Sequence, residues 1–224
     1  MKESFRFAFL KTIPVMLGYL FLGLAFGLLL QEAGYSFWWA LLISAIVYAG
    51  SIQFVLVSFL TAGTSLPVVA VMTLLINSRH AFYGLTFIEK FKAMKSRPYM
   101  IFSLTDETFS LVSTLEPPEG VARRDFYFWI SLLDYLYWQV GCTLGNAVGG
   151  LLTFDTTGLD FTLTALFIVL LLEQVRKKEN RAAGIIGMVC TAASLAVFGP
   201  DNFLIPAMIL LLAVLLGGRK KLCK

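Results

Sequence analysis

Charged residues are scarce in this sequence, which excludes an ordinary water-soluble domain. Lys, Arg, Asp and Glu make up 14% of the 224 residues, whereas soluble domains carry about a quarter. Hydrophobic residues make up 58%, and the mean hydropathy is +0.80. Because so few charges cannot cover a globular surface, the composition predicts a protein whose solvent is the lipid bilayer.

Metal-ligating and nucleophilic residues are also few. The chain has one histidine, His80, and three cysteines without metal-ligand spacing, and it lacks a Gly-Lys phosphate-binding motif. We therefore expect no metal, no cofactor and no ATP hydrolysis, and we predict that the protein is not an enzyme. The net charge of +4 lies in clusters between apolar segments, which favours contact with the lipid bilayer over nucleic-acid binding.

Long uncharged runs are what the sequence has instead. Runs of 20, 46, 20, 19 and 17 uncharged residues follow Lys11, Glu32, Asp134, Arg181 and Asp201. About 20 apolar residues cross a bilayer as a helix. We expect an all-α, polytopic transmembrane helical bundle, with residues 1–224 forming a single transmembrane transporter domain. About six full spans are expected, at 12–31, 37–60, 126–152, 159–175, 182–199 and 202–217.

Two further apolar segments, 66–87 and 100–115, are interrupted by polar residues. If 66–87 crosses the membrane fully, the four basic residues of the 90–97 loop lie outside, against the positive-inside rule. If both segments are interrupted or re-entrant, that loop and both termini lie in the cytoplasm. We favour the second arrangement, in the inner (cytoplasmic) membrane of the cell, because interrupted helices line binding cavities in transporters.

A short motif recurs and suggests an internal two-fold repeat. The two copies, 118 residues apart, are Tyr19-x3-Gly23-x3-Gly27 and Tyr137-x3-Gly141-x3-Gly145. The repeat halves would be 12–115 and 126–217, and whether they are parallel or inverted stays open. Chance recurrence in glycine-rich helices is the alternative. For the glycines themselves, close helix packing is the simplest interpretation.

Polar side chains within the apolar segments are the candidate site residues. Gln53 lies in a long uncharged run, where lipid cannot satisfy its amide, so it needs a neighbouring helix or a substrate. Asn77 and Arg79 follow an apolar half-span, and Arg79 can bind a carboxylate. His80 can carry a proton near neutral pH. The alternative is that this segment lies at the interface, with Arg79 reaching the headgroups.

Acidic residues form the complementary set. Asp106 and Glu107 are adjacent, so on a helix they point about 100° apart, and we expect one of them to pair with Arg79 while the other faces a cavity. Such a carboxylate can bind an ammonium group or a proton, or it can serve only as a structural ion pair. Asp134 lies a third of the way into 126–152, as a coupling-ion site or as a partner for Arg123 or Arg124.

Four motifs give the chain a resemblance to the AzlC-type family of branched-chain amino acid exporters. They are Gly23-Leu24-Ala25-Phe26-Gly27, Ala49-Gly50-Ser51-Ile52-Gln53-Phe54, Asn77-Ser78-Arg79-His80-Ala81-Phe82-Tyr83-Gly84 and Leu104-Thr105-Asp106-Glu107-Thr108-Phe109. The chain departs from the family pattern at Ser78, where a leucine is usual, and at Ile52, where an alanine is usual. The resemblance implies export of small apolar amino acids, with a small AzlD-type membrane protein as the second subunit.

The expected mechanism is that of a proton-coupled secondary transporter. A zwitterionic substrate needs groups for its carboxylate and its ammonium, and the expected substrate-binding residues are Gln53, Asn77, Arg79, Asp106 and Glu107. The expected proton-coupling residues are His80, Asp106, Glu107 and Asp134. The alternatives are a carrier of another amino acid or organic solute, or a membrane scaffold subunit that transports nothing.

Overall fold

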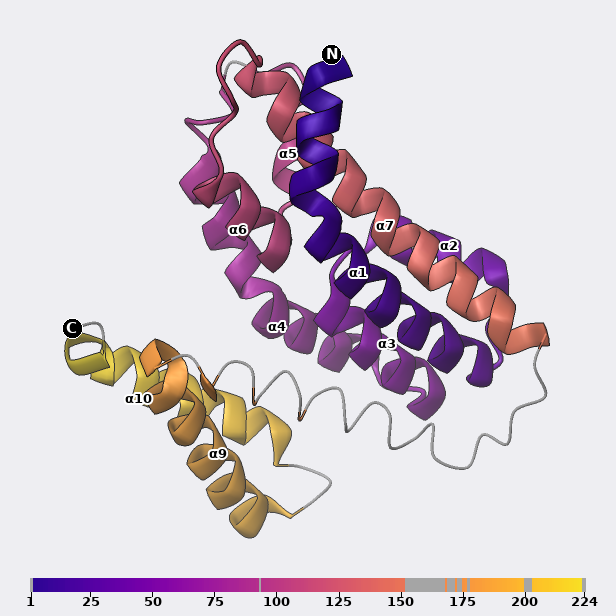
Figure 1. Ribbon diagram of the computed structural model, residues 1–224. Helices are drawn as coiled ribbons and strands as arrows, with labels where there is room; N and C mark the ends of the chain where they lie inside the picture. The colour runs from indigo at the N-terminus through magenta and orange to yellow at the C-terminus, as the bar shows by residue number, and fades with distance from the viewer. Residues whose placement is uncertain are drawn as a thin grey trace. The chain divides into compact units, whose positions relative to one another are not determined.

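The structure is a computed structural model that describes residues 2–92, 94–151, 178–199 and 203–222, together with residues 168, 172, 175 and 176. All regular secondary structure in these residues is helical, as predicted (Figure 1). The chain divides into two compact units, Met1–Thr156 and Thr157–Lys224. The first contains α1 (Lys2–Glu32), α2 (Phe37–Ile46), α3 (Gly50–Ala62), α4 (Leu66–Phe87), α5 (Arg97–Phe102), α6 (Asp106–Thr114) and α7 (Arg123–Leu151).

The second unit contains α9 (Lys178–Phe198) and α10 (Leu204–Leu222), which pack against each other. They correspond to the predicted spans 182–199 and 202–217, whereas the predicted span 159–175 lies outside the described residues. Three described helices are long and apolar enough to cross a membrane: Glu3–Glu32, Leu66–Phe87 and Arg181–Phe198. The total number of spans and the single-domain organisation stay predictions.

Helices α1 and α7 form the centre of the first unit and run side by side in the same direction (Figure 1). At one end Phe5 packs edge-on against Trp129, and at the other Gln31 lies against Gly149. Between these ends, a Cβ added to Gly23 would lie 2.8 Å from the backbone nitrogen of Cys142. The backbones therefore approach each other through their glycines, as lipid-embedded helices do.

The recurring glycine motif is explained by this contact. A Cβ on Gly27 would overlap the carbonyl oxygen of Cys142, and one on Gly145 would overlap the carbonyl oxygen of Leu24. The two copies of the motif thus pack directly against each other, which confirms the packing interpretation of the glycines. Gene duplication and the two-fold repeat stay predictions.

The predicted span 37–60 is not one helix, because the chain breaks at Val47–Ala49 between α2 and α3. Tyr48 has a φ of +39°, a left-handed conformation that a helix interior does not accept. Helix α2 starts beside Asn146, which donates to the Tyr35 carbonyl, and reaches Tyr135, whose hydroxyl donates to the Ala45 carbonyl. Helix α3 then runs back, so the pair extends only part of the way along α7.

Helix α4 is continuous, and the predicted interruption of 66–87 at Asn77–His80 is therefore wrong. The physical reason lies in the neighbours of this segment. Both terminal nitrogens of Arg79 find partners on two other helices, Asp106 and Ser51, so the polar cluster is accommodated without a broken backbone. Helix α4 is the only described helix between α1 and α7 that is long enough to span a membrane.

The second predicted interruption, within 100–115, is confirmed. Helix α5 ends at Phe102 and helix α6 begins at Asp106, with Ser103–Thr105 between them. The far end of α6 lies near the start of α7, where the Tyr127 hydroxyl donates to the Leu115 carbonyl at 3.0 Å. The α5–α6 pair therefore approaches the centre of α7 from the end opposite to the α2–α3 pair.

We call the two breaks, Val47–Ala49 between α2 and α3 and Ser103–Thr105 between α5 and α6, the tips of these helix pairs. The two tips meet near the middle of α7. The rings of Tyr48 and Phe102 lie 6.0 Å apart between centroids, and each packs against Tyr135, at 4.8 and 6.2 Å. At the end where α7 begins, Lys95 and Arg124 line one cavity of about 230 Å³. The 90–97 loop and the starts of α1 and α7 thus share one end of the first unit.

Candidate functional site

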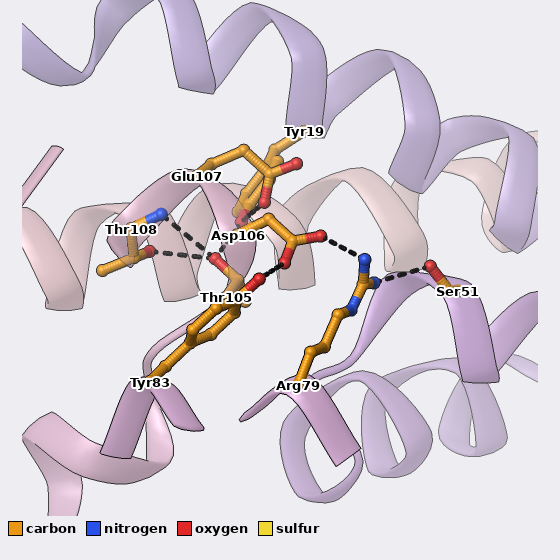
Figure 2. A network of polar contacts seen from close by, with 8 residues as sticks. All are labelled: Tyr19, Ser51, Arg79, Tyr83, Thr105, Asp106, Glu107 and Thr108. Atoms are coloured by element: carbon orange, nitrogen blue, oxygen red, sulfur yellow. Dashed lines mark hydrogen bonds and ion pairs between the residues drawn. The ribbon is translucent and has the colours of Figure 1, made fainter. Parts of the chain in front are cut away.

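An ion pair between α4 and α6 lies beside the meeting point of the two tips. Arg79 Nη1 is 2.8 Å from Asp106 Oδ2, and Arg79 Nη2 donates to the Ser51 hydroxyl at 3.0 Å (Figure 2). The Tyr83 hydroxyl donates to Asp106 Oδ1 at 2.6 Å. One guanidinium thus joins α3, α4 and α6, and both oxygens of the Asp106 carboxylate are engaged.

Glu107 points away from Asp106 and reaches α1 instead. The Tyr19 hydroxyl donates to Glu107 Oε2 at 2.8 Å and lies 2.5 Å from the Thr105 hydroxyl (Figure 2). Thr105 caps α6, because its hydroxyl accepts the Thr108 N–H at 3.2 Å. The divergence predicted for adjacent carboxylates is confirmed, with Asp106 as the partner of Arg79.

Asp134 continues this network into α7. Its side chain is fully buried, and the Thr108 hydroxyl donates to Asp134 Oδ2 at 2.8 Å. The other oxygen, Oδ1, has no hydrogen bond within the described residues. In the same part of the chain no Lys, Arg or His lies within ion-pair distance of it, so the pairing with Arg123 or Arg124 is absent. An unpaired buried carboxylate is costly, so this group needs a proton or a cation.

Gln53 bridges α3 and α7. Its Oε1 accepts the Trp138 indole N–H at 2.9 Å and the Ala49 backbone N–H at 3.2 Å. Its Nε2 is buried and has no partner among the described residues. The predicted interhelical hydrogen bond is therefore present, and half of the amide is left unsatisfied.

Asn77 and His80 are the two predicted site residues that the structure leaves at the margin. Asn77 has a buried Oδ1 without a partner among the described residues. The His80 ring lies 5.7 Å from the Tyr83 ring, and within the described part of the chain no hydrogen bond joins it to the network. Both share α4 with Arg79, but neither is bonded to the central carboxylates.

The sequence interpretation did not assign a site role to several residues of the network. They are Tyr19, Tyr48, Ser51, Tyr83, Thr105, Thr108 and Trp138. Thr105 carried a usable signal, since a threonine directly before Asp106-Glu107 is typical of a helix start. The tyrosines and the tryptophan carried none, because aromatic residues are common in membrane helices.

Lys90, just beyond α4, fastens the far end of α6. Its Nζ donates to the Val112 carbonyl at 2.7 Å and lies 4.4 Å from the centroid of the Tyr127 ring. Burial lowers the pKa of Lys90, and this effect outweighs the attraction of Glu116. The α5–α6 pair is thus held at both ends, by Lys90 and by the network around Thr105.

The described residues define a helical membrane protein with charged and polar side chains gathered at helix breaks. Among them, no group of three or more His, Cys, Asp or Glu could hold a metal ion. One cation, three carboxylates and several hydroxyls are instead held close together. This arrangement suits a small ligand that carries both charges.

The chain belongs to the AzlC protein family. The family model, described as AzlC protein, matches residues 14–152. The chain is 39% identical over 222 residues to the Bacillus subtilis branched-chain amino acid transport protein AzlC, covering 99% of this chain and 87% of that one.

Other relatives are named only as membrane proteins. An uncharacterized membrane protein of Helicobacter pylori is 42% identical over 98% of this chain and 97% of its own length. The Escherichia coli inner membrane protein YgaZ is 30% identical over 89% of this chain and 82% of its own length. No solved structure matches the chain.

Proposed function

We propose that this protein is a subunit of a secondary transporter that exports branched-chain or other small apolar amino acids. The observation that carries the proposal is the network from Arg79 to Asp134, which lies where two broken helix pairs meet. Its one fully buried carboxyl group is Asp134, and charge inside a membrane is expensive and usually marks a substrate or ion pathway. The name of the Bacillus subtilis relative supports amino acids as the substrate class.

The membrane topology we propose follows from the broken pairs. Helices α1, α4 and α7 cross the membrane, whereas α2–α3 and α5–α6 each enter and leave on one side. Because the starts of α1 and α7 and the 90–97 loop share one end of the unit, their basic residues all face the cytoplasm. With the three predicted spans 159–175, 182–199 and 202–217 after α7, both termini are cytoplasmic in this topology. The name of the Escherichia coli relative favours the inner membrane.

The substrate contacts we propose lie around the two tips. A branched-chain amino acid is a zwitterion with an aliphatic side chain, so it needs a carboxylate site, an ammonium site and apolar walls. The substrate-binding residues proposed for this purpose are Gln53, Asn77, Arg79, Asp106 and Glu107. Free N–H groups at the broken end of α3 add donors for the carboxylate.

Proton coupling supplies the driving force in this proposal. The candidate coupling groups are His80, Asp106, Glu107 and Asp134, and the isolated buried carboxyl of Asp134 fits the role best. A protonophore should abolish uphill efflux from cells that express the protein. Unchanged efflux after uncoupling would remove the proton from the mechanism.

The partner we propose is a small AzlD-type membrane protein. Many large apolar side chains of α4 are exposed in the single chain, including Leu74, Phe82 and Leu85. Lipid or a second subunit would cover this face. Co-purification of the two proteins from membranes tests the partnership, and a fully active chain without the small subunit would contradict it.

An efflux assay tests the function itself. Cells are loaded with a leucine-containing dipeptide, and leucine release is followed with the wild-type protein and with Arg79→Gln. Arg123→Gln is the matched control, because Arg123 pairs with Glu116 at an exposed position. The proposal expects release that depends on Arg79 and not on Arg123. Equal leucine pools with and without the wild-type protein would favour the scaffold alternative, and release of other solutes instead would favour a different carrier.

A further inference from the structure

Most of the unsatisfied polar atoms of the centre lie outside the ion pair, in which only Arg79 Nε has no hydrogen-bond partner among the described residues. Both oxygens of Asp106 are engaged, and Arg79 donates through both terminal nitrogens. Three buried side-chain atoms near the α2–α3 break have no hydrogen-bond partner among the described residues instead. They are the Tyr48 hydroxyl, Gln53 Nε2 and Asp134 Oδ1, on residues that are 3%, 0% and 0% exposed. Buried polar groups are rarely left unpaired, so each needs a ligand or water.

Asp134 and Tyr48 form the acceptor side of this group. The Tyr48 ring packs against Tyr135, which follows Asp134 in the sequence, and the Tyr48 hydroxyl lies near Asp134 and near Thr108, which donates to Asp134. The other titratable groups that interact with Asp134 are Glu107 of α6 and three tyrosines, Tyr19, Tyr99 and Tyr137. None of them is a base that carries positive charge. This surrounding favours a cation.

Gln53 forms the donor side. The orientation of its amide is fixed, because Oε1 accepts the N–H groups of Trp138 and Ala49, and Nε2 must therefore point away from both. The amide lies at the N-terminus of α3, where no described residue accepts the N–H groups of Gly50, Ser51 or Ile52. This cluster of free donors, with the positive end of the helix dipole, favours a carboxylate.

Both sides of this group lie against the same stretch of α7. Gln53 is bonded to Trp138, which lies four residues after Asp134 on the same buried face of α7. Positions i and i+4 of a helix lie one turn apart on one face, with Cβ atoms about 5–6 Å from each other. Asp134 and the α7 partner of Gln53 are therefore neighbours on the face of α7 that the α2–α3 break contacts.

We propose that Asp134 Oδ1 and the Tyr48 hydroxyl bind the ammonium group of the transported amino acid. In the same site, Gln53 Nε2 and the first N–H groups of α3 bind its carboxylate. This assignment rests on the proposed transport function and moves the head group from the Arg79–Asp106 pair to the α2–α3 break. The left-handed backbone of Tyr48 then has a purpose, since it turns the chain so that these groups face α7. Proton and ammonium occupy the same Asp134 oxygen in turn.

The test measures how the purified full-length protein, with its small subunit, binds three ligands by competition against radiolabelled leucine. The ligands are leucine, 4-methylpentanoate, which lacks the ammonium, and 3-methylbutylamine, which lacks the carboxylate. Asp134→Asn should lower the binding affinity for leucine and 3-methylbutylamine by about tenfold or more and leave the affinity for 4-methylpentanoate unchanged. Gln53→Met should lower the binding affinity for leucine and 4-methylpentanoate and leave the affinity for 3-methylbutylamine unchanged.

Two further variants keep this test decisive. Tyr48→Phe removes one of the two proposed ligands of the ammonium group, so it tests the ammonium site if Asp134→Asn fails to fold. Ser131→Ala is the control, because its hydroxyl is another unpartnered buried group on α7 and should not change any of the three affinities. Wild-type leucine affinity in Asp134→Asn, or equal weakening of all ligands, overturns the head-group assignment alone. No binding of leucine by the wild-type protein overturns the proposed function as well.

Discussion

Arg79 on α4 and Asp106 at the start of α6 form an ion pair of 2.8 Å in a sequence where charge is scarce. The pair joins a continuous helix to the tip of a broken one. Arg79 also donates a hydrogen bond to Ser51 of α3, and Asp106 also accepts one from Tyr83. Four side chains from three helices thus fix the relative positions of the elements around the proposed pathway.

Breaking this pair is expected to abolish transport. Arg79→Gln or Asp106→Asn leaves the other, half-buried charge without its partner beside the proposed pathway, and we expect leucine efflux to fall by about tenfold or more. Leucine efflux per unit of membrane protein is the measurement. Efflux close to the wild-type rate in both variants would show that the pair is only a dispensable contact.

Glycine substitutions in the α1–α7 contact are expected to destabilise the protein. In Gly27→Ala the new methyl group meets the backbone of Cys142, and overpacking of this kind costs about 1–3 kcal/mol. The melting temperature in detergent should fall by several degrees. Gly18→Ala on the same helix is the control, because nothing lies within 4 Å of its Cβ position. Equal melting temperatures for both variants would contradict the described packing.

Loss of the N-terminal cap of α6 is expected to destabilise the break between α5 and α6. Thr105→Val removes the acceptor for the Thr108 N–H and the contact with Tyr19, and an N-cap is worth about 1 kcal/mol. Thr105→Ser keeps the hydroxyl and should restore most of the stability. Thermal unfolding of the purified variants measures both effects, and indistinguishable curves for Val and Ser would argue against the cap.

Cysteine labelling tests the proposed topology. In a variant without native cysteines, Lys92→Cys should react with a membrane-impermeant reagent only from the cytoplasmic side, and Thr64→Cys only from the outside. The reason is that α4, which is long and apolar enough to span, crosses the membrane between them in the proposed topology. Labelling of both positions from the same side would mean that α4 does not span.

The sequence predicted the helical class, most helix positions and the polar residues that the network joins. It predicted the interruption of 100–115 because Asp106 and Glu107 lie in the middle of this apolar segment, and the structure places the break directly before them. It misplaced the other break. The charge of Arg79 suggested an interrupted α4, yet its partners come from α3 and α6, which are distant in sequence. The break at Tyr48 lies in an uncharged run, where hydropathy cannot distinguish one span from two half-length helices.

The candidate site was predictable only in part, for a related reason. Charged residues within apolar segments are recognisable because placing a charge in a membrane costs free energy. Arg79, Asp106, Glu107 and Asp134 were therefore identified from the sequence. Tyr48 and Trp138 are compatible with lipid and carry no such signal. Their roles depend on contacts between the tips and α7, which only the three-dimensional arrangement shows.

Transport by the purified protein in liposomes is the most direct test of the central claim. Vesicles containing the protein and the proposed small subunit are given an inward or outward proton gradient, and the movement of radiolabelled leucine is recorded. The account predicts leucine movement against its gradient in exchange for protons, with at least tenfold less in Arg79→Gln and with Arg123→Gln at the wild-type level. Leucine flux equal to that of protein-free vesicles would contradict it.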